Sequence, residues 1–308
     1  ISKLGDINMT INFDNKVAIV TGAGGGLGRS HALQLAKRGA KVVVNDLGGN
    51  VDGTGGSSEA ADKVVEEIKA AGGEAISNGS SVTDKSGVNK LVEDTMSAFG
   101  RIDILINNAG VLRDKSFAKV TLDDFEFVVD VHLMGSVYCT KAVWPIMVEQ
   151  NYGRIVMTSS SSGIFGNFGQ SNYGAAKMGV VGLMNTLKIE GKKYNIKVNS
   201  LVPVAATRMT ENLGMPDAVF ESLKPETVSP AVIFMSSENA PDGAMISAGA
   251  GVFAKAEIVH SEGIALKGDD LNADMLADKW SEVSDMQNGK ALLSGAEHTA
   301  HIFKKLSG

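Results

Sequence analysis

The chain has 308 residues and carries 29 basic against 35 acidic side chains, a net charge of −6. This mild acidity disfavours nucleic acid or an anionic membrane surface as the main partner. Glycine is common, with 36 residues, whereas proline is scarce, with 6, so the glycines are predicted to serve turns inside an ordered fold rather than a disordered linker.

Cysteine use and the distribution of charge bear on the compartment. Cys139 is the single cysteine, so it can form neither an intrachain disulfide nor a thiolate zinc site, which favours a reducing compartment and predicts a cytoplasmic protein. The longest uncharged stretch, Ile155–Ala176, contains four consecutive serines and is not predicted to span a membrane. Lys3 and Asp6 interrupt the start, where a secretory signal would be apolar. The ending Leu306–Gly308 does not match a peroxisomal address.

The chain is interpreted as one domain with an additional segment at each end. Ile1–Asn8 precede the first methionine, and because a natural chain rarely begins with isoleucine, they are interpreted as an expression remnant outside the fold. Residues 9–267 are predicted to form the main domain, and the charged, helix-prone residues 268–308 a C-terminal extension for packing or oligomer contacts. His298 and His301 in this extension lack further metal ligands and are interpreted as a solvated pair.

From Lys16 onward the chain repeats a short β-branched run, a glycine turn and an amphipathic helical pattern. The predicted strands with clear apolar runs are the first (Val17–Val20), second (Val42–Asn45), fourth (Ile104–Asn107), fifth (Ile155–Thr158) and sixth (Val198–Val202) of the sheet. Two clear helices are Ser57–Ala71 and Lys85–Phe99. The apolar runs are continuous rather than alternating, as expected for a parallel sheet covered on both faces. The repetition predicts an α/β fold with a doubly wound parallel sheet, a Rossmann fold. Leu47–Gly56 departs from the repeat as a long glycine-rich loop after the second strand.

The first turn has the composition of a dinucleotide-binding turn. Thr21–Gly28 reads TGAGGGLG and joins the first strand to a helix that continues to about Arg38. Glycines let the backbone approach a pyrophosphate, and the helix N-terminus offers free N–H groups. Asp46, at the end of the second strand, is expected to bind the adenosine ribose hydroxyls and repel a 2′-phosphate, which predicts NAD as the cofactor. The NNAG segment Asn107–Gly110 ends the fourth strand at the same edge and is predicted to contact the same ligand.

Tyr173 and Lys177 lie four residues apart on a predicted helix and therefore share one face. A nearby ammonium favours the phenolate and is expected to lower the tyrosine pKa from ~10 toward the range of general acid–base catalysis. Ser160 lies thirteen residues before Tyr173, just after the fifth strand, and could hydrogen-bond a substrate carbonyl oxygen. Composition alone leaves the serines at positions 159, 161 and 162 as alternatives.

Taken in order, the motifs TGxxxGxG, NNAG and S-x12-Y-x3-K resemble the classical short-chain dehydrogenase/reductase family, over roughly Asn12–Gly251. The resemblance implies an NAD-dependent oxidoreductase in which Tyr173 is the general acid/base and Ser160 orients the carbonyl. Lys177 would hold the nicotinamide ribose and tune the tyrosine. The cofactor contacts that it implies are Gly22, Gly26, Leu27, Gly28, Asp46, Val82, Asn108, Ala109, Gly110, Tyr173, Lys177, Pro203 and Thr207. It implies no metal.

Several longer segments are similar to the (3R)-hydroxyacyl-CoA dehydrogenase unit of type 2 peroxisomal multifunctional enzymes. They are NDLGGNVDGTGGSSEAAD, Val111–Asp114 (VLRD), DVHLMGS and YGRIVMTSSSSGIFGNFGQSNYGAAK. This similarity implies interconversion of (3R)-3-hydroxyacyl-CoA and 3-ketoacyl-CoA in fatty-acid metabolism. A steroid or small secondary-alcohol dehydrogenase is the alternative, since substrates in the family vary with the loop after the sixth strand. A catalytically idle NAD-binding scaffold is disfavoured, because the serine, tyrosine and lysine are all present.

The sequence also departs from the family pattern. His132 stands where the classical family has an asparagine that anchors a relay water, and because histidine titrates near neutrality, it is the first alternative base if Tyr173 is not the base. Ser81 replaces an aspartate after the third strand, which leaves Val82 as the expected backbone neighbour of adenine. Pro203 is followed by valine instead of glycine, and Thr207 is the candidate for contacting the carboxamide or pyrophosphate.

The resemblance implies a homodimer or homotetramer that pairs through helices near Leu122–Gln150 and Ser171–Tyr194. The apolar residues Val180, Val181 and Leu183 of the second helix are more numerous than one sheet face should need, which favours such an interface.

Overall fold

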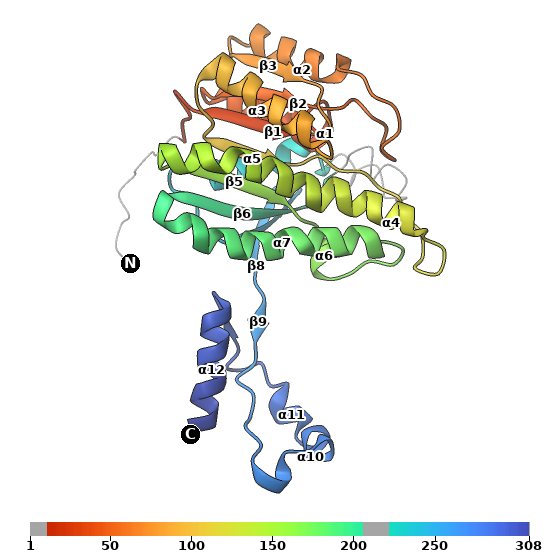
Figure 1. The fold of residues 1–308 in the computed structure, drawn as a ribbon, viewed down its shortest axis with the longest axis vertical. Coiled ribbons are helices and arrows are strands. Elements are labelled where there is room, and N and C mark those ends of the chain that lie inside the picture. The colour runs from red at the N-terminus through yellow and green to blue at the C-terminus, as the bar shows by residue number, and fades with distance from the viewer. Residues whose placement is uncertain (1–10, 206–221, 308) are drawn as a thin grey trace. The chain divides into compact units, whose positions relative to one another are not determined.

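The computed structural model describes residues 11–205 and 222–307 (Figure 1). The chain forms two compact units that divide between Lys255 and Ala256, earlier than position 268, where the sequence pattern places the start of the extension. The predicted remnant Ile1–Asn8 lies outside the described residues.

Within the described residues, the first unit is built on one eight-stranded sheet in the order β3-β2-β1-β4-β5-β6-β7-β8. The strands are β1 (Val17–Thr21), β2 (Lys41–Asn45), β3 (Ala75–Asn78), β4 (Ile104–Asn107), β5 (Gly153–Thr158), β6 (Ile196–Pro203), β7 (Met245–Gly249) and β8 (Val252–Ala256). Neighbours from β3 through β7 are parallel. The predicted doubly wound parallel sheet is therefore confirmed, and each of the five predicted strands is present.

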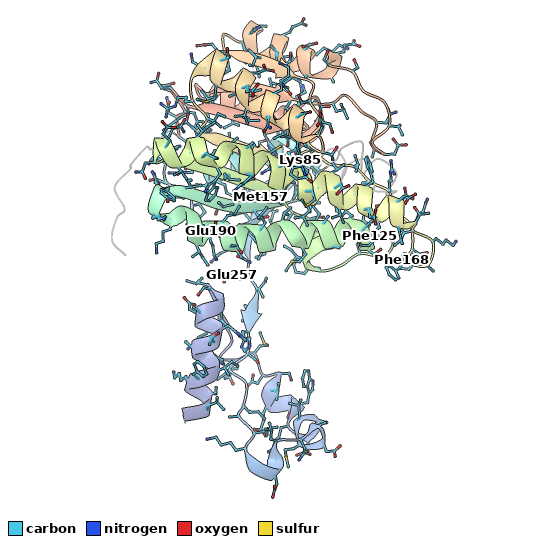
Figure 2. All side chains as sticks on the ribbon, in the orientation of Figure 1. Lys85, Phe125, Met157, Phe168, Glu190 and Glu257 are labelled. Carbon is cyan, nitrogen blue, oxygen red and sulfur yellow. The ribbon has the colours of Figure 1, made fainter. Side chains whose placement is uncertain are left out.

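Helices cover both faces of the sheet, as the continuous apolar strands require. The helices among the described residues of this unit are α1 (Gly26–Lys37), α2 (Glu59–Ala70), α3 (Lys85–Phe99), α4 (Leu122–Val129), α5 (Gly135–Gln150), α6 (Ser161–Ile164), α7 (Ser171–Gly191) and α9 (Ser229–Ser236). A π-helical turn lies at Asp130–Met134, and 3₁₀ turns lie at Lys192–Tyr194 and Pro225–Thr227. α1, α2 and α9 pack on one face, and α3, α5 and α7 cover the other (Figure 1). Figure 2 shows exposed side chains such as Lys85 and Glu190 on the helices of the second face.

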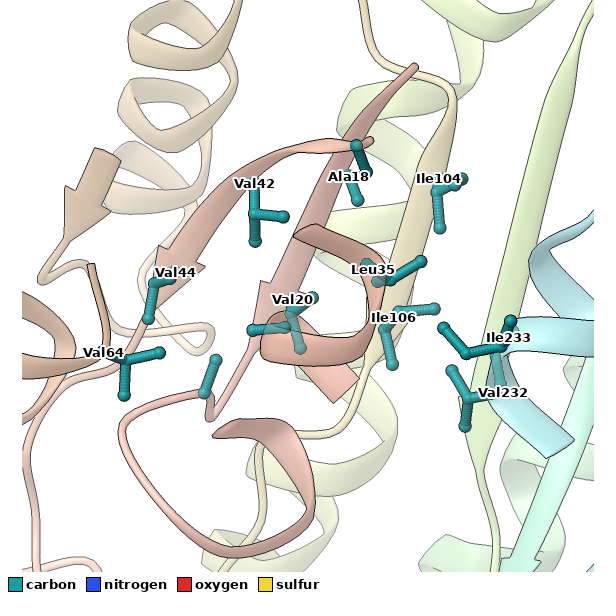
Figure 3. Close-up of a cluster of buried hydrophobic side chains, with 14 of the residues drawn as sticks. Ala18, Val20, Leu35, Val42, Val44, Val64, Ile104, Ile106, Val232 and Ile233 are labelled. Atoms are coloured by element: carbon teal, nitrogen blue, oxygen red, sulfur yellow. The ribbon is translucent and has the colours of Figure 1, made fainter. Parts of the chain in front are cut away.

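The apolar core lies between the sheet and its helices. On the first face, alternate strand residues such as Ala18 and Val20 of β1 meet Leu35 of α1, with Val232 and Ile233 of α9 beside them (Figure 3). All five residues of β1 are buried, because both faces of this central strand are covered. The core thus fixes the positions of the strand ends from which the site is built.

The strand order reverses between β1 and β4, since β2 and β3 continue to one side and β5, β6 and β7 to the other. A crevice forms at the carboxyl ends of the strands at such a switch point, and ligands of open α/β sheets bind there. The TGAGGGLG turn after β1 and the NNAG segment after β4 flank this crevice directly.

The second unit contains a two-stranded antiparallel ribbon and short helices. Its elements are β9 (Val259–His260), a 3₁₀ turn at Gly268–Asp270, α10 (Ala273–Asp278), α11 (Trp280–Val283), β10 (Lys290–Ala291) and α12 (Gly295–Ser307). His298 and His301 both place their rings next to His260, with centroids 5.3 and 5.2 Å away. Among the described residues no group of three or more histidine, cysteine or acidic side chains is arranged to hold a metal ion, and no described helix is long and apolar enough to cross a membrane.

Candidate active site

A cavity of about 380 Å³ opens at the switch point of the sheet. Its walls come from the glycine turn, the end of β2, the 47–53 loop, Ser80–Thr83, the segment after β4, the π-helical turn and α7. The predicted residues that line it are Gly22, Gly26, Leu27, Asp46, Val82, Asn108, Ala109, Gly110, His132, Tyr173, Lys177 and Pro203. Segments far apart in the sequence therefore meet around one space. Gly28 and Ser160 are not among the lining residues, and Thr207 lies outside the described residues.

The glycine turn is shaped by positions that a side chain could not occupy. Gly22 has a left-handed backbone, with φ of +62°, and it lies against Ala109. A Cβ at Gly28 would lie 2.2 Å from the carbonyl oxygen of Gly22, so this glycine allows α1 to approach the turn from behind instead of lining the cavity. Gly25, the N-cap of α1, provides no side-chain hydrogen bond to the helix. The N-terminal N–H groups of α1 thus have no side-chain cap, as an anion site requires.

The Asp46 carboxylate joins the glycine turn to the second strand. Its Oδ2 accepts a hydrogen bond from the Gly24 amide at 2.7 Å, and its Oδ1 accepts one from the Gly48 amide at 2.6 Å. Each carboxylate oxygen has further acceptor capacity, and Asp46 lines the cavity. The geometry fits ribose hydroxyls at this position, and the predicted contact with them stays a prediction.

Asn108 holds the two central strand ends together. Its side-chain amide donates to the carbonyl oxygens of Thr21 and Gly22, at 3.0 Å each. The Thr21 hydroxyl in turn accepts hydrogen bonds from the amides of Asn108 and Ala109, at 3.0 and 3.1 Å. The NNAG segment therefore positions the glycine turn from the neighbouring strand, besides lining the cavity.

Tyr173 and Lys177 lie on one face of α7 and line the same cavity as Asp46. The Lys177 ammonium lies 5.5 Å from the centre of the Tyr173 ring and donates a 2.6 Å hydrogen bond to the Thr158 carbonyl oxygen at the end of β5. This carbonyl contact was not foreseen, because a backbone acceptor has no signature in the sequence.

The four consecutive serines have different surroundings. Ser160 is the N-cap of α6, and its hydroxyl hydrogen-bonds the Tyr173 phenol. Ser159 instead donates to the Lys177 carbonyl at 2.7 Å, and Ser162 donates to Gln170 at 2.6 Å. Ser160 is therefore the serine that accompanies the tyrosine, as the spacing suggested.

The pKa shifts differ from the sequence-based expectation. Burial raises the pKa of Tyr173 above its usual value, and the hydrogen bond with Ser160 opposes this only in part. The expected lowering by lysine is therefore wrong for the cofactor-free protein. The physical reason is that burial also lowers the pKa of Lys177, to about 7, so its charge is itself disfavoured.

His132 lies in the π-helical turn and is buried. Its ring is edge-on to Tyr173, with the centroids 5.0 Å apart, and its Nε2 lies 2.7 Å from the Val111 carbonyl oxygen. Burial, followed by the charge of Lys177, lowers the pKa of His132 well below its ordinary value. The expectation that this histidine titrates near neutrality is therefore wrong, and its ring is neutral at physiological pH.

Two further residues near the site were missed by the sequence reasoning. Asn172 is buried, donates from its side chain to the Arg113 carbonyl at 3.1 Å and accepts from the Tyr173 amide at 2.8 Å. Arg113 contacts the glycine-rich loop and Asp124. A polar residue beside the predicted catalytic tyrosine was the available signal for Asn172, whereas Arg113 appeared only within the VLRD segment.

Comparisons with known proteins agree with this geometry. The sequence profile of the short chain dehydrogenase family matches residues 16–217. Peroxisomal multifunctional enzyme type 2 of Drosophila melanogaster is 49% identical over 300 residues, which cover 96% of this chain and 50% of that protein. The chain thus spans about half the length of this curated relative.

Two solved structures are also similar. A short chain dehydrogenase from Mycobacterium avium superposes with a TM-score of 0.76 at 38% identity, covering 88% of this chain and 95% of that one. A 7α-hydroxysteroid dehydrogenase, solved with NADH and 7-oxo glycochenodeoxycholic acid, superposes with a TM-score of 0.70 at 26% identity, covering 78% of this chain and 95% of that one.

Proposed function

Since this chain belongs to the short-chain dehydrogenase family, we propose that it is an NAD-dependent oxidoreductase that interconverts (3R)-3-hydroxyacyl-CoA and 3-ketoacyl-CoA in fatty-acid metabolism. One observation supports this above all others. Tyr173 and Lys177 line the same cavity as the glycine turn and Asp46, and Ser160 hydrogen-bonds the tyrosine. A group that can exchange a proton is thereby placed in a cavity suited to a dinucleotide.

Each residue has a distinct part in the proposed reaction. In the oxidation direction, Tyr173 as phenolate takes the proton of the substrate hydroxyl, and Ser160 orients the oxygen by a hydrogen bond. In reduction, the neutral phenol returns the proton to the carbonyl oxygen. Lys177 holds the nicotinamide ribose and favours the phenolate when charged. When bound, NAD supplies the hydride acceptor at carbon 4 of its nicotinamide.

The substrate class is argued from the relatives, and a panel of substrates tests it. The segments similar to the (3R)-hydroxyacyl-CoA dehydrogenase unit favour an acyl-CoA substrate. The similar structure named as a 7α-hydroxysteroid dehydrogenase makes a steroid the second candidate. NADH formation would be followed by its fluorescence with (3R)- and (3S)-3-hydroxyacyl-CoA esters, with steroids and with secondary alcohols. We expect turnover of the (3R) series. Comparable rates with the (3S) esters would reject the stereochemistry, and activity on steroids alone would reject the acyl-CoA substrate.

Asp46 is expected to make the enzyme prefer NAD over NADP. Its carboxylate would face the 2′-phosphate of NADP, and neither Gly25 nor Leu47 supplies a positive charge to neutralise that phosphate. The ratio of kcat/KM for the two cofactors measures the preference. Asp46→Ala should bring the ratio of the two kcat/KM values closer to one, because it relieves the repulsion of the 2′-phosphate of NADP. It also removes the acceptor of the Gly24 and Gly48 amides. A wild-type enzyme with equal kcat/KM values, or with a preference for NADP, would refute the assignment.

We propose a homodimer or a dimer of dimers, and part of the sequence argument for it needs correction. Val180 and Val181 are 1% and 0% exposed in the single chain, so they pack inside the domain and are no evidence for an interface. The exposed apolar side chains of α7 are Met178 and Ile189. Light scattering at micromolar concentration should give two or four times the chain mass of 32.2 kDa. A mass of one chain would contradict the proposal.

The cytoplasmic location is retained as a proposal. Cys139 is buried, and burial raises the pKa of its thiol to about 12, which is typical of an unreactive structural cysteine. The name of the Drosophila relative places that protein in peroxisomes. Fluorescent tagging of the full protein in its own cell would decide between the compartments.

A further inference from the structure

The glycine-rich loop Leu47–Gly56 forms one wall of the cavity. Five of its residues line the cavity together with residues of the glycine turn, namely Leu47, Gly49, Asn50, Val51 and Gly53. At its base, the Ser57 amide donates to the Leu47 carbonyl oxygen at 2.9 Å, which closes the loop on itself. The loop therefore extends from the end of β2 as a strap beside the place proposed for the dinucleotide.

The tip of the strap is attached to the segment that follows β4. The Leu112 amide donates to the Val51 carbonyl oxygen at 2.9 Å, and the Arg113 Nε donates to the Asp52 carbonyl oxygen at 3.1 Å. Gly53, with φ of +84°, packs directly on Phe127, so that a Cβ there would lie 2.6 Å from the ring. Contacts from two different elements thus hold the tip down.

Arg113 joins these contacts in one planar group. Its Nη1 donates to Asp124 at 3.0 Å, and its guanidinium carbon lies 4.0 Å from the centre of the Phe127 ring. The Arg113 carbonyl also accepts the Asn172 side chain, and Asn172 in turn accepts the Tyr173 amide. The strap is therefore anchored to a residue whose backbone is itself fixed to the first turn of the helix that carries Tyr173.

We propose that Arg113 is a positioning residue that clasps the Leu47–Gly56 strap over the dinucleotide and thereby sets how slowly the reduced cofactor dissociates. The inference rests on the proposed function, because it takes the cavity to be the NAD site. A planar guanidinium presents its donors in a rigid fork and stacks flat on a ring at the same time, whereas a lysine ammonium is a compact point charge that cannot stack in this way. The clasp consequently requires arginine and not merely a positive charge.

The chain offers a matched control for the substitution of Arg113 and another for the substitution of Gly53. Lys115 also pairs with Asp124, at 3.0 Å, but its side-chain hydrogen bond is to that carboxylate and not to the strap. Gly55 shares the left-handed backbone of Gly53, with φ of +76°, yet a Cβ there would meet only the Asn50 side chain at 3.7 Å. Lys115→Ala and Gly55→Ala therefore repeat the local changes without releasing the tip.

The test measures NADH dissociation by stopped-flow fluorescence and NADH affinity by titration, neither of which needs the acyl-CoA substrate. Arg113→Ala should raise the dissociation rate and Kd by about tenfold, in line with the loss of a charge-assisted hydrogen bond. Arg113→Lys should behave like Arg113→Ala, and Gly53→Ala should also accelerate dissociation. Lys115→Ala and Gly55→Ala should stay within about twofold of wild type. Lys115→Ala and Gly55→Ala should also keep the wild-type kcat at saturating NAD.

The outcomes separate the clasp from the proposed function. If wild type binds NADH but Arg113→Ala or Gly53→Ala dissociates no faster than its control, the clasp is overturned and the NAD site stands. If Arg113→Lys releases NADH at the wild-type rate, charge alone suffices, and the clasp is likewise overturned. If the wild-type protein binds neither NADH nor NADPH, the proposed function and the clasp are overturned together. Gly53→Ala leaves Arg113 in place, so it keeps the test decisive even if the arginine variants fold poorly.

Discussion

Replacing Tyr173 by phenylalanine is expected to lower turnover by ~10²–10⁴-fold, the usual contribution of general acid–base catalysis. The substitution removes the phenol oxygen and leaves the ring that packs edge-on against His132. NAD affinity should stay within about twofold, because the glycine turn, Asp46 and Asn108 are untouched. Steady-state kcat and an NADH titration on the same preparation measure both quantities.

The pH dependence of the same variant provides a second readout. Burial raises the pKa of Tyr173 in the cofactor-free protein, so the phenolate needed for oxidation gains population as the pH rises. Oxidation by wild type should therefore speed up toward alkaline pH, and Tyr173→Phe should lose that increase. A variant that keeps a tenth or more of wild-type turnover would assign the base elsewhere. His132 is a poor substitute, because its lowered pKa makes it a weak base.

Lys177→Met is expected to lower turnover by up to ~10²-fold, the lower end of the usual contribution of general acid–base catalysis, and to weaken NAD binding as well. The two losses have one cause, since the ammonium is proposed both to hold the nicotinamide ribose and to favour the Tyr173 phenolate. Met has a similar length, so the packing of α7 is retained. Parallel measurements of kcat and of Kd for NADH distinguish this variant from Tyr173→Phe, in which only kcat should change. An unchanged Kd for NADH would show that Lys177 does not hold the nicotinamide ribose.

The same variant should alter how stability depends on pH. The pKa of Lys177 is about 7 in the folded protein, against an ordinary value of 10.5. Between these values the unfolded chain binds the proton that the folded protein has released, so the free energy of unfolding rises with pH from about 7 to 10.5. Below pH 7 the buried charge destabilises the folded state fully. The gain in stability of Lys177→Met over wild type should thus be largest below pH 7 and shrink toward pH 10.5. Denaturant unfolding of the cofactor-free proteins measures this, and a constant difference would contradict it.

The sheet and most of the residues that line the cavity could be predicted, because local patterns encode them. Continuous apolar runs marked β1, β4 and β5 within two residues, and the NNAG and TGAGGGLG segments occupy the strand ends where they were expected. Tyr173 and Lys177 share a face of α7, as four-residue spacing dictates. These features depend on residues close in the sequence, or on the regular geometry of a parallel sheet.

Features that depend on long-range packing could not be predicted. The pKa of Tyr173 follows from how deeply the folded chain buries it, and spacing from Lys177 does not reveal that depth. Val180 and Val181 looked surplus to one sheet face, yet both are buried within the domain. The role of Arg113 arises from contacts with residues 61 positions before it and 11 after it. No local motif connects such partners.

The π-helical turn Asp130–Met134 determines how positions are matched between related chains. An α-helix advances about 100° per residue, and a turn closed by i→i+5 bonds holds one residue more than an α-helical turn. An extra residue inserted into a regular α-helix would rotate α4 against α5 by about 100°, which would turn buried Val128 out of the core and Phe127 away from the loop it supports. The wide turn accommodates the extra residue and keeps both helices in place. Counting from NNAG to His132 is therefore valid only between chains that share the wide turn. Where a relative has a regular helix instead, the residue in the same place would be one number away.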